Sequence, residues 1–114
     1  MTSPITTHVL DMSGGRPAAG VAVTLERQLA AGQWHKVGHG HTDADGRLKA
    51  LLAPGKLEAG GYRLLFDVGV YFDGRGTPTF YRVVPIEFHV NDTKQHYHVP
   101  LLVSPFGYST YRGS

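Results

Sequence analysis

The sequence of 114 residues contains no cysteine. Disulfide bonds, thiolate metal sites and a cysteine nucleophile are therefore excluded. Charged side chains are also scarce, because Asp, Glu, Lys and Arg make up 18% of the chain, against about 25% in an average soluble domain. The formal net charge of +2 is too small to predict a nucleic acid or a membrane as partner. We expect instead that another copy of the chain covers part of the surface.

Long hydrophobic segments are missing as well. The longest apolar run, at 50–53, is far shorter than the ~20 residues that span a bilayer. Residues 1–9 lack a basic start followed by an apolar stretch, so we expect no signal peptide. The C-terminal Arg112-Gly113-Ser114 is not the Ser-Lys-Leu peroxisomal signal. We therefore expect a cytoplasmic protein with one domain, 1–114, since the chain is too short for two.

Glycine (15) and proline (7) are spread along the chain and punctuate segments in which apolar and polar residues alternate. This period of two predicts β-strands. About eight are expected, at 5–11, 21–26, 33–42, 47–51, 62–68, 80–90, 97–103 and 107–112. Asp45-Gly46 predicts a hairpin between the third and the fourth, and a short helix is expected at 70–74. The predicted fold is an all-β, two-sheet β-sandwich.

Two strands have features that bear on their surroundings. The strand at 97–103 is apolar on both faces, since Pro100 and Leu102 lie opposite its core-facing residues. Strands of this kind are covered on both sides, so we expect a homo-oligomer built on this strand and on the last one, near the chain terminus. Pro85 cannot donate to a neighbouring strand and is expected at an edge or a bulge.

Three side chains are candidates for chemistry. His8 and His98 both lie on the face of their strand that points away from the core. An imidazole on a partly apolar face can have a shifted pKa suited to acid–base catalysis, although a half-exposed histidine without a role gives the same pattern. Arg47 directly follows the turn at Asp45-Gly46 and could bind an oxyanion, or could be an ordinary solvated arginine.

The C-terminal segment 108–114 carries two tyrosines, an arginine and the terminal carboxylate. Chain ends that fray are usually small and featureless. We therefore expect this tail to dock on the rest of the domain.

Histidines also occur in a spacing that suits metal binding. His39 and His41 share a strand face with His35, and His96 shares one with His98. Two imidazoles on one face can bind zinc, but no Asp or Glu is placed by the sequence to complete such a site. We expect no physiological metal.

Several motifs together identify a family. The motifs occur in the following order: 5–11 (ITTHVLD), 16–20 (RPAAG), 42–47 (TDADGR), 62–64 (YRL), 96–102 (HYHVPLL) and 111–114 (YRGS). Over essentially the whole chain, the sequence resembles the transthyretin-like 5-hydroxyisourate hydrolases. The terminal tetrapeptide is the most specific part, because it separates these enzymes from the hormone-carrying transthyretins of the same fold.

The resemblance implies a homotetramer of two-sheet sandwiches, with active sites between paired dimers. It also implies cofactor-free hydrolysis of 5-hydroxyisourate, the product of urate oxidation, to 2-oxo-4-hydroxy-4-carboxy-5-ureidoimidazoline. The implied catalytic and substrate-binding residues are His8, Arg47, His98, Tyr111, Arg112, Gly113 and Ser114.

These residues suggest roles in the attack of water on a ring carbonyl. His98 would act as general base, and Arg47 would stabilise the oxyanion. His8 would orient the substrate or the water, or protonate the departing ring nitrogen; the sequence leaves the division between the two histidines open. Tyr111 and the Ser114 carboxylate would close the site and hold an imidazole in its working tautomer.

Two alternatives come from other classes. A transthyretin-like carrier would hold a small aromatic ligand in the channel between dimers without catalysis. A metal-dependent hydrolase would use the paired histidines described above.

Overall fold

The computed structural model describes residues 3–114 and consists mainly of strands. Met1 and Thr2 lie outside the described residues. These two residues belong to the predicted domain 1–114 and to the segment 1–9 considered above. The elements in chain order are β1 (Ile5–Asp11), β2 (Arg16–Pro17), β3 (Ala22–Ala30), β4 (Gln33–His41), β5 (Arg47–Leu48), β6 (Gly60–Phe66), α1 (Val68–Asp73), β7 (Val84–Val90), β8 (Tyr97–Ser104) and β9 (Gly107–Thr110). In this part of the chain, no helix has the length and apolarity that a bilayer crossing requires.

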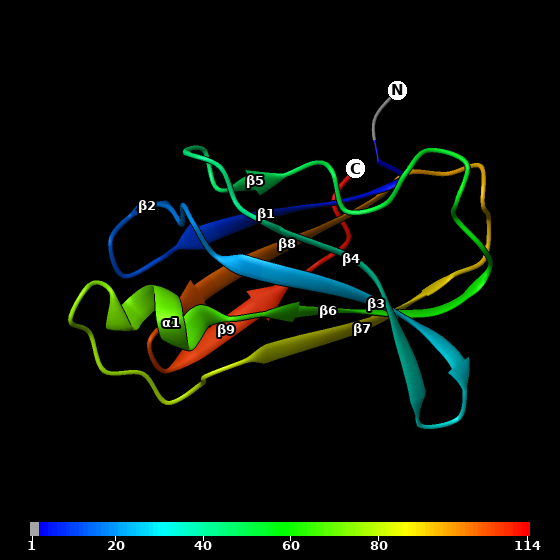
Figure 1. The fold of residues 1–114 in the computed structure, drawn as a ribbon. Helices are drawn as coiled ribbons and strands as arrows, with labels where there is room; N and C mark the ends of the chain where they lie inside the picture. The colour runs from blue at the N-terminus through cyan, green and yellow to red at the C-terminus, as the bar shows by residue number, and fades with distance from the viewer. Residues whose placement is uncertain (1–2) are drawn as a thin grey trace.

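The strands form two sheets that enclose one apolar core (Figure 1). One sheet has the order β2-β1-β8-β9, with β5 also beside β1, and the other has the order β4-β3-β6-β7. Fully buried Val9 and Leu101 from the first sheet and Leu25 and Leu64 from the second belong to this core. The alternation along these strands places every second side chain inside. The predicted all-β sandwich is confirmed.

The first sheet depends on a parallel pair, β1 and β8, which run side by side from Ile5↔Tyr97 to Asp11↔Val103. The remaining strand pairs in residues 3–114 are antiparallel. The parallel register sets Thr6 directly beside His98. Both residues belong to the outer face of this sheet.

The hairpin predicted at Asp45-Gly46 is wrong. A tight turn is present, since the Gly46 N–H donates to the Asp43 carbonyl (2.9 Å) and Gly46 has a φ of +77°. The strands on either side, however, belong to different sheets: β4 pairs with β3, whereas β5 pairs with β1. A turn signal specifies a chain reversal but not the strand that follows. β5 is also only two residues long, and β2 was not predicted.

The predicted short helix is present but begins two residues early, at Val68. Asp67 precedes it, and its carboxylate accepts a hydrogen bond from the Val70 N–H (3.5 Å), as N-cap residues do. The helix lies at one end of the sandwich (Figure 1, left). Val68 and Phe72 are fully buried and fix it against the core despite the glycines around it.

The expectations for the two prolines have different outcomes. Pro85 lies in β7, the outer strand of its sheet, so the predicted edge position is confirmed. Pro100 is buried by this chain's own C-terminal segment, since Thr110 Oγ1 donates to the Pro100 carbonyl (2.7 Å). Leu102 stays half-buried. The second apolar face of β8 is therefore covered in part without a partner subunit.

A buried carboxylate ties β1 to the helix. Asp11 accepts hydrogen bonds from the Ser13 N–H and hydroxyl, from the Gly14 N–H and from the Tyr71 hydroxyl (2.8 Å). Burial raises the pKa of Asp11, but these hydrogen bonds outweigh it and hold the pKa below its usual value. The carboxylate is thus ionised and satisfied inside the protein.

Replacing Tyr71 with phenylalanine is expected to lower the free energy of unfolding by about 1.5–3 kcal/mol, the usual worth of a hydrogen bond to a charged group. Urea denaturation at pH 7 measures the change, and Tyr108→Phe, at an exposed tyrosine, serves as control. Because the pKa of Asp11 is lowered on folding, this stability is present above the ordinary carboxyl pKa and lost as the pH falls below it. Equal stability of the two variants would contradict the assignment.

Candidate active site

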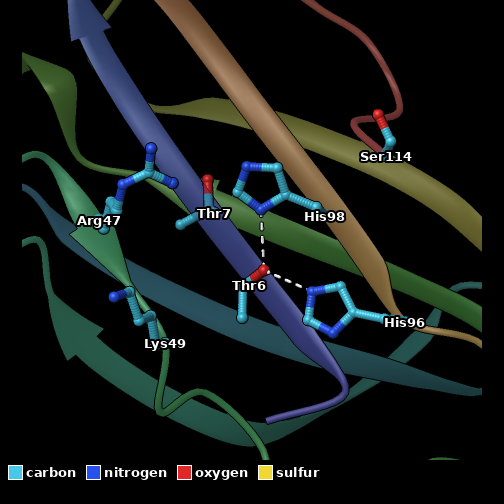
Figure 2. Close-up of a pocket in the computed structure, with 7 residues that line it drawn as sticks. All are labelled: Thr6, Thr7, Arg47, Lys49, His96, His98 and Ser114. Carbon is cyan, nitrogen blue, oxygen red and sulfur yellow. Dashed lines mark hydrogen bonds between the residues drawn. The ribbon is translucent and has the colours of Figure 1, made fainter. Parts of the chain in front are cut away.

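A pocket of about 340 Å³ opens on the outer face of the first sheet (Figure 2). Its wall combines residues from β1, β5, β8 and the C-terminal tail, which are distant in sequence. The lining residues are Thr6, Thr7, Arg47, Lys49, His96, His98 and Ser114. Three of the predicted site residues, Arg47, His98 and Ser114, are thus brought together. The convergence of imidazole, guanidinium and hydroxyl groups is suited to acid–base chemistry.

His98 is the half-buried member of this group. Its Nδ1 lies 2.8 Å from Thr6 Oγ1, and its other ring nitrogen, Nε2, points away from Thr6 (Figure 2). Burial lowers the pKa of His98, and the positive charges of Arg47, His96 and His8 lower it further. The imidazole is therefore neutral at neutral pH, as a general base must be.

Arg47 is positioned by the turn that precedes it. The Asp43 carboxylate accepts hydrogen bonds from the backbone N–H groups of Arg47 (3.0 Å) and Asp45 (2.9 Å). The bond from Arg47 lowers the pKa of Asp43 most, although burial opposes it. A Cβ on Gly46 would lie 2.4 Å from the Val9 carbonyl oxygen, so only glycine lets the turn approach β1 this closely.

The Arg47 side chain is exposed. Among residues 3–114, the ion pairs involve other arginines, Arg27, Arg63 and Arg82. The Arg47 guanidinium therefore keeps its donors for a ligand in the pocket.

His8 lies next to the pocket without lining it. It is paired in register with Arg47 across β1 and β5, and its Nε2 donates to the Asp45 carbonyl (2.9 Å). This bond fixes the Nε2–H tautomer and leaves Nδ1 as the acceptor. His8 is close enough for its charge to lower the pKa of His98.

The C-terminal tail docks on β8, as predicted. The Gly113 N–H donates to the His98 carbonyl (2.8 Å), and this pairing brings Ser114 to the pocket wall. A Cβ on Gly113 would lie 2.6 Å from Cδ2 of the His98 ring. Glycine is therefore required for the tail to lie flat against the imidazole.

Replacing Gly113 with alanine is expected to push the tail or the His98 ring out of place and to lower kcat by about 10²-fold, the cost of a misplacement near 1 Å. Steady-state kinetics measure the effect, and Gly107→Ala is the matched control, because a Cβ there meets only Ser104 Oγ at 3.8 Å. Unchanged kcat in Gly113→Ala would show that the tail does not shape the site.

Tyr111 and Arg112 do not reach this pocket. The Arg112 guanidinium lies over the Tyr97 ring (4.5 Å to the centroid) and donates to Gln95 Oε1 (2.8 Å). Both tail residues line a second pocket, of about 270 Å³, beside β7. In the single chain Arg112 fastens the tail, and neither residue forms part of the pocket that holds His98.

Sequence reasoning did not select Thr6, Thr7 or Lys49, and it considered His96 only as a metal ligand. A signal for two of them was available: Thr6 shares the outer strand face with His8, and Lys49 lies two residues after Arg47. Side chains two apart point the same way in an extended chain. Thr7 is different, since it is buried and its hydroxyl donates to the Val99 carbonyl (2.6 Å).

The histidine pairs lie close together, with ring centroids 5.5 Å apart for His39 and His41 and 6.5 Å apart for His96 and His98. Within residues 3–114, no group of three or more His, Cys, Asp or Glu side chains is arranged to hold a metal ion. His35 does not join the pair on β4.

The two sheets, the short helix and the docked tail define a transthyretin-like β-sandwich. The chain belongs to the HIUase/Transthyretin family, whose model matches residues 5–113. This confirms the family resemblance drawn from the sequence motifs.

Several proteins similar to this chain are named 5-hydroxyisourate hydrolase. The chain is 50% identical to the 5-hydroxyisourate hydrolase of Caulobacter vibrioides, covering 98% of this chain and 99% of that one. It is 43% identical to the enzyme of that name from Mus musculus, covering 99% and 97%. Among solved structures, the 5-hydroxyisourate hydrolase of Klebsiella pneumoniae matches with a TM-score of 0.84 and 37% identity, covering all of both chains.

Two further structures share the fold. Sea bream transthyretin in complex with thyroxine has a TM-score of 0.91 at 33% identity, covering 96% of this chain and 94% of that one. An (S)-allantoin synthase has a TM-score of 0.88 at 38% identity and covers 99% of this chain. This chain spans only 44% of that longer protein.

Proposed function

We propose that this chain hydrolyses 5-hydroxyisourate to 2-oxo-4-hydroxy-4-carboxy-5-ureidoimidazoline, with no cofactor and with His98 and Arg47 as its principal catalytic residues. The observation that carries the mechanism is a half-buried imidazole, held at Nδ1 by Thr6, in one pocket with a guanidinium; burial and the neighbouring positive charges lower the pKa of this imidazole. The proposed substrate agrees with the name of the relatives that match nearly the whole chain.

The reaction begins with a water molecule between His98 and a ring carbonyl of the substrate. His98 Nε2 takes a proton from the water while the water oxygen forms a bond to the carbonyl carbon. The carbonyl oxygen becomes an oxyanion, to which Arg47 donates two N–H groups. Lys49, which also lines the pocket, adds a second positive charge. Both cations therefore stabilise the charge that develops in the transition state.

The tetrahedral intermediate then breaks its carbon–nitrogen bond. The protonated His98 returns its proton to the departing ring nitrogen, and a carboxylic acid and a ureido group remain. His8 positions the substrate through Nδ1, because its Nε2 is bound to the Asp45 carbonyl. Ser114 closes the pocket at the end of the tail.

A direct assay tests the proposal. Urate oxidase generates 5-hydroxyisourate from urate, and its ultraviolet absorbance is followed with and without this protein. We expect decay to accelerate in proportion to protein concentration, and dialysis against a chelator to leave the rate unchanged. A rate that stays at the spontaneous value would refute the activity, and a rate abolished by the chelator would favour the metal-dependent alternative.

We propose the carrier alternative as second because of the match to a thyroxine-bound transthyretin. The pocket here, however, is lined by Arg47, Lys49 and two imidazoles, whereas sites for drug-sized apolar ligands are lined mainly by apolar side chains. Saturable binding of an aromatic ligand without turnover would favour the carrier.

We also propose a homotetramer whose sites lie between dimers. β7 and β9 are outer strands of their sheets and can pair with a second copy. The outer face of the first sheet also carries the half-buried Leu102, which lines a shallow pocket with the exposed Met12, and apolar side chains exposed in this way are typical of subunit contacts. Sedimentation equilibrium should give four chains per particle, and a fully active monomer would exclude this assembly.

The expected cytoplasmic location remains part of the proposal and is tested by cell fractionation.

A further inference from the structure

Thr6 lies between two imidazoles. Its Oγ1 is 2.8 Å from His98 Nδ1 and 2.8 Å from His96 Nε2 (Figure 2). Thr6 is 7% exposed, and the parallel register of β1 and β8 holds it beside His98. The three side chains therefore form a short hydrogen-bonded chain from the exposed His96 through Thr6 to the half-buried His98.

The number of protons restricts how this chain can be arranged. A hydroxyl has one proton to donate, so Thr6 donates to one imidazole and accepts from the other when both are neutral. In the first arrangement, His98 Nδ1–H donates to Thr6, and Thr6 donates to His96 Nε2. In the second, His96 Nε2–H donates to Thr6, and Thr6 donates to His98 Nδ1.

Only the first arrangement supports general-base catalysis. There the His98 proton is on Nδ1, so Nε2 carries a lone pair that can accept a proton from water. In the second arrangement Nε2 is already protonated and cannot act as a base. Protonation of His96 forces the second arrangement while His98 is neutral, because both nitrogens of an imidazolium are donors.

We propose that His96 is a positioning residue that acts through Thr6 to set the tautomer of His98, and that protonation of His96 switches the base off. This inference rests on the proposed hydrolysis only where it predicts a change in the rate of turnover. His96 is exposed and exchanges protons directly with solvent, whereas His98 is half-buried.

Other charged groups surround the hydrogen-bonded chain of His96, Thr6 and His98, which we call the relay. Arg47 and Lys49 come from β5 and the segment after it, His8 from β1, Ser114 from the tail, and Arg112 donates to the His96 carbonyl (3.2 Å). His8 is tied to the Asp45 carbonyl rather than to Thr6. Of these groups within residues 3–114, His96 and His98 are the ones whose side chains hydrogen-bond to Thr6.

The first experiment reads the tautomer without any turnover. In protein labelled with nitrogen-15 histidine, NMR assigns the protonated nitrogen of His98 at pH 8 and again at lower pH, where His96 takes up its proton. We expect Nδ1–H in the wild type at high pH and a shift to Nε2–H as His96 is protonated. Thr6→Val, which keeps the shape but removes the hydroxyl, should abolish this coupling, and Thr6→Ser should restore it. A His98 tautomer that is unaffected by Thr6→Val would overturn the proposal.

The second experiment follows kcat as a function of pH. Thr6→Val should lower kcat about 10- to 100-fold, a loss like that seen when a metal-binding histidine loses the hydrogen-bond partner that orients it, with KM nearly unchanged, and Thr6→Ser should recover most of it. His96→Gln offers an amide that does not titrate, so its activity should persist to lower pH than in the wild type. Identical acid limbs in His96→Gln and the wild type would contradict the switch. If the wild type lacked turnover, the proposed function would fail, while the NMR result would still decide the relay.

Discussion

Replacing His98 with asparagine is expected to lower kcat/KM for 5-hydroxyisourate by about 10²–10⁴-fold, the usual contribution of a general base. Asparagine can still occupy the space near Thr6 and hydrogen-bond to it. It offers no basic nitrogen in place of His98 Nε2, which lies on the side of the ring away from Thr6 (Figure 2). Water then reaches the substrate carbonyl without a group that removes its proton.

The matched control is His39→Asn, an exposed histidine on β4 in the other sheet. The same substitution there should leave kcat/KM and the urea midpoint close to those of the wild type. His98→Asn should also keep the fold, since Gly113 bonds to the backbone of residue 98 and not to its side chain. A His98→Asn variant with full activity would contradict the base assignment, and ligand binding retained without any turnover in the wild type would favour a carrier.

Much of the fold could be predicted from local sequence. β1 has the predicted bounds, β7 lies within the predicted range 80–90, and β8 extends the predicted range 97–103 by one residue. These strands could be predicted because alternation of apolar and polar residues over seven or eight positions indicates which face of a sheet is buried. Pro85 was placed at an edge for a similarly local reason, since it lacks the N–H that an inner strand needs.

The pairing of the strands could not be predicted in this way. β1 and β8 are parallel neighbours although some 90 residues separate Thr6 from His98, and nothing in either strand specifies the other. The hairpin at Asp45-Gly46 was wrong for the same reason, because β5 bonds to β1 rather than to β4. Register between distant strands is set by the packing of the whole core.

In the candidate site, too, some features could be predicted from single segments and others depend on how distant strands pair. The outward positions of His8 and His98 and the place of Arg47 after a turn could be read from single segments. Thr6 as the contact of both His96 and His98 depends on the parallel register, so the relay became visible only in the structure. The direction of the Arg112 side chain, away from the pocket and onto Tyr97, is likewise a tertiary property.

Arg47 has the second large expected effect, and two substitutions separate its two contributions. Arg47→Lys keeps a positive charge near His98 but loses the paired N–H donors that a guanidinium presents. Arg47→Met loses both. We expect kcat to fall by about 10²–10³-fold in each, as when an oxyanion donor is removed, with the larger loss in Arg47→Met. Arg16→Lys, at an exposed arginine of β2, is the control and should leave kcat unchanged.

The pH dependence then distinguishes the two variants. The charge of Arg47 is one cause of the lowered pKa of His98; the neutral imidazole is favoured because a second positive charge beside it costs free energy. In the His96→Gln background, where His98 itself sets the acid limb, removing that charge in Arg47→Met should raise the pKa of His98, so the residual activity should be lost at a higher pH on acidification. In Arg47→Lys the acid limb should stay near its wild-type position. An acid limb that stays in place in Arg47→Met would show that Arg47 does not act on His98. A shift confined to that variant would show that the charge of Arg47 keeps the base unprotonated, and the loss of kcat in Arg47→Lys would show separately that the paired N–H donors are needed.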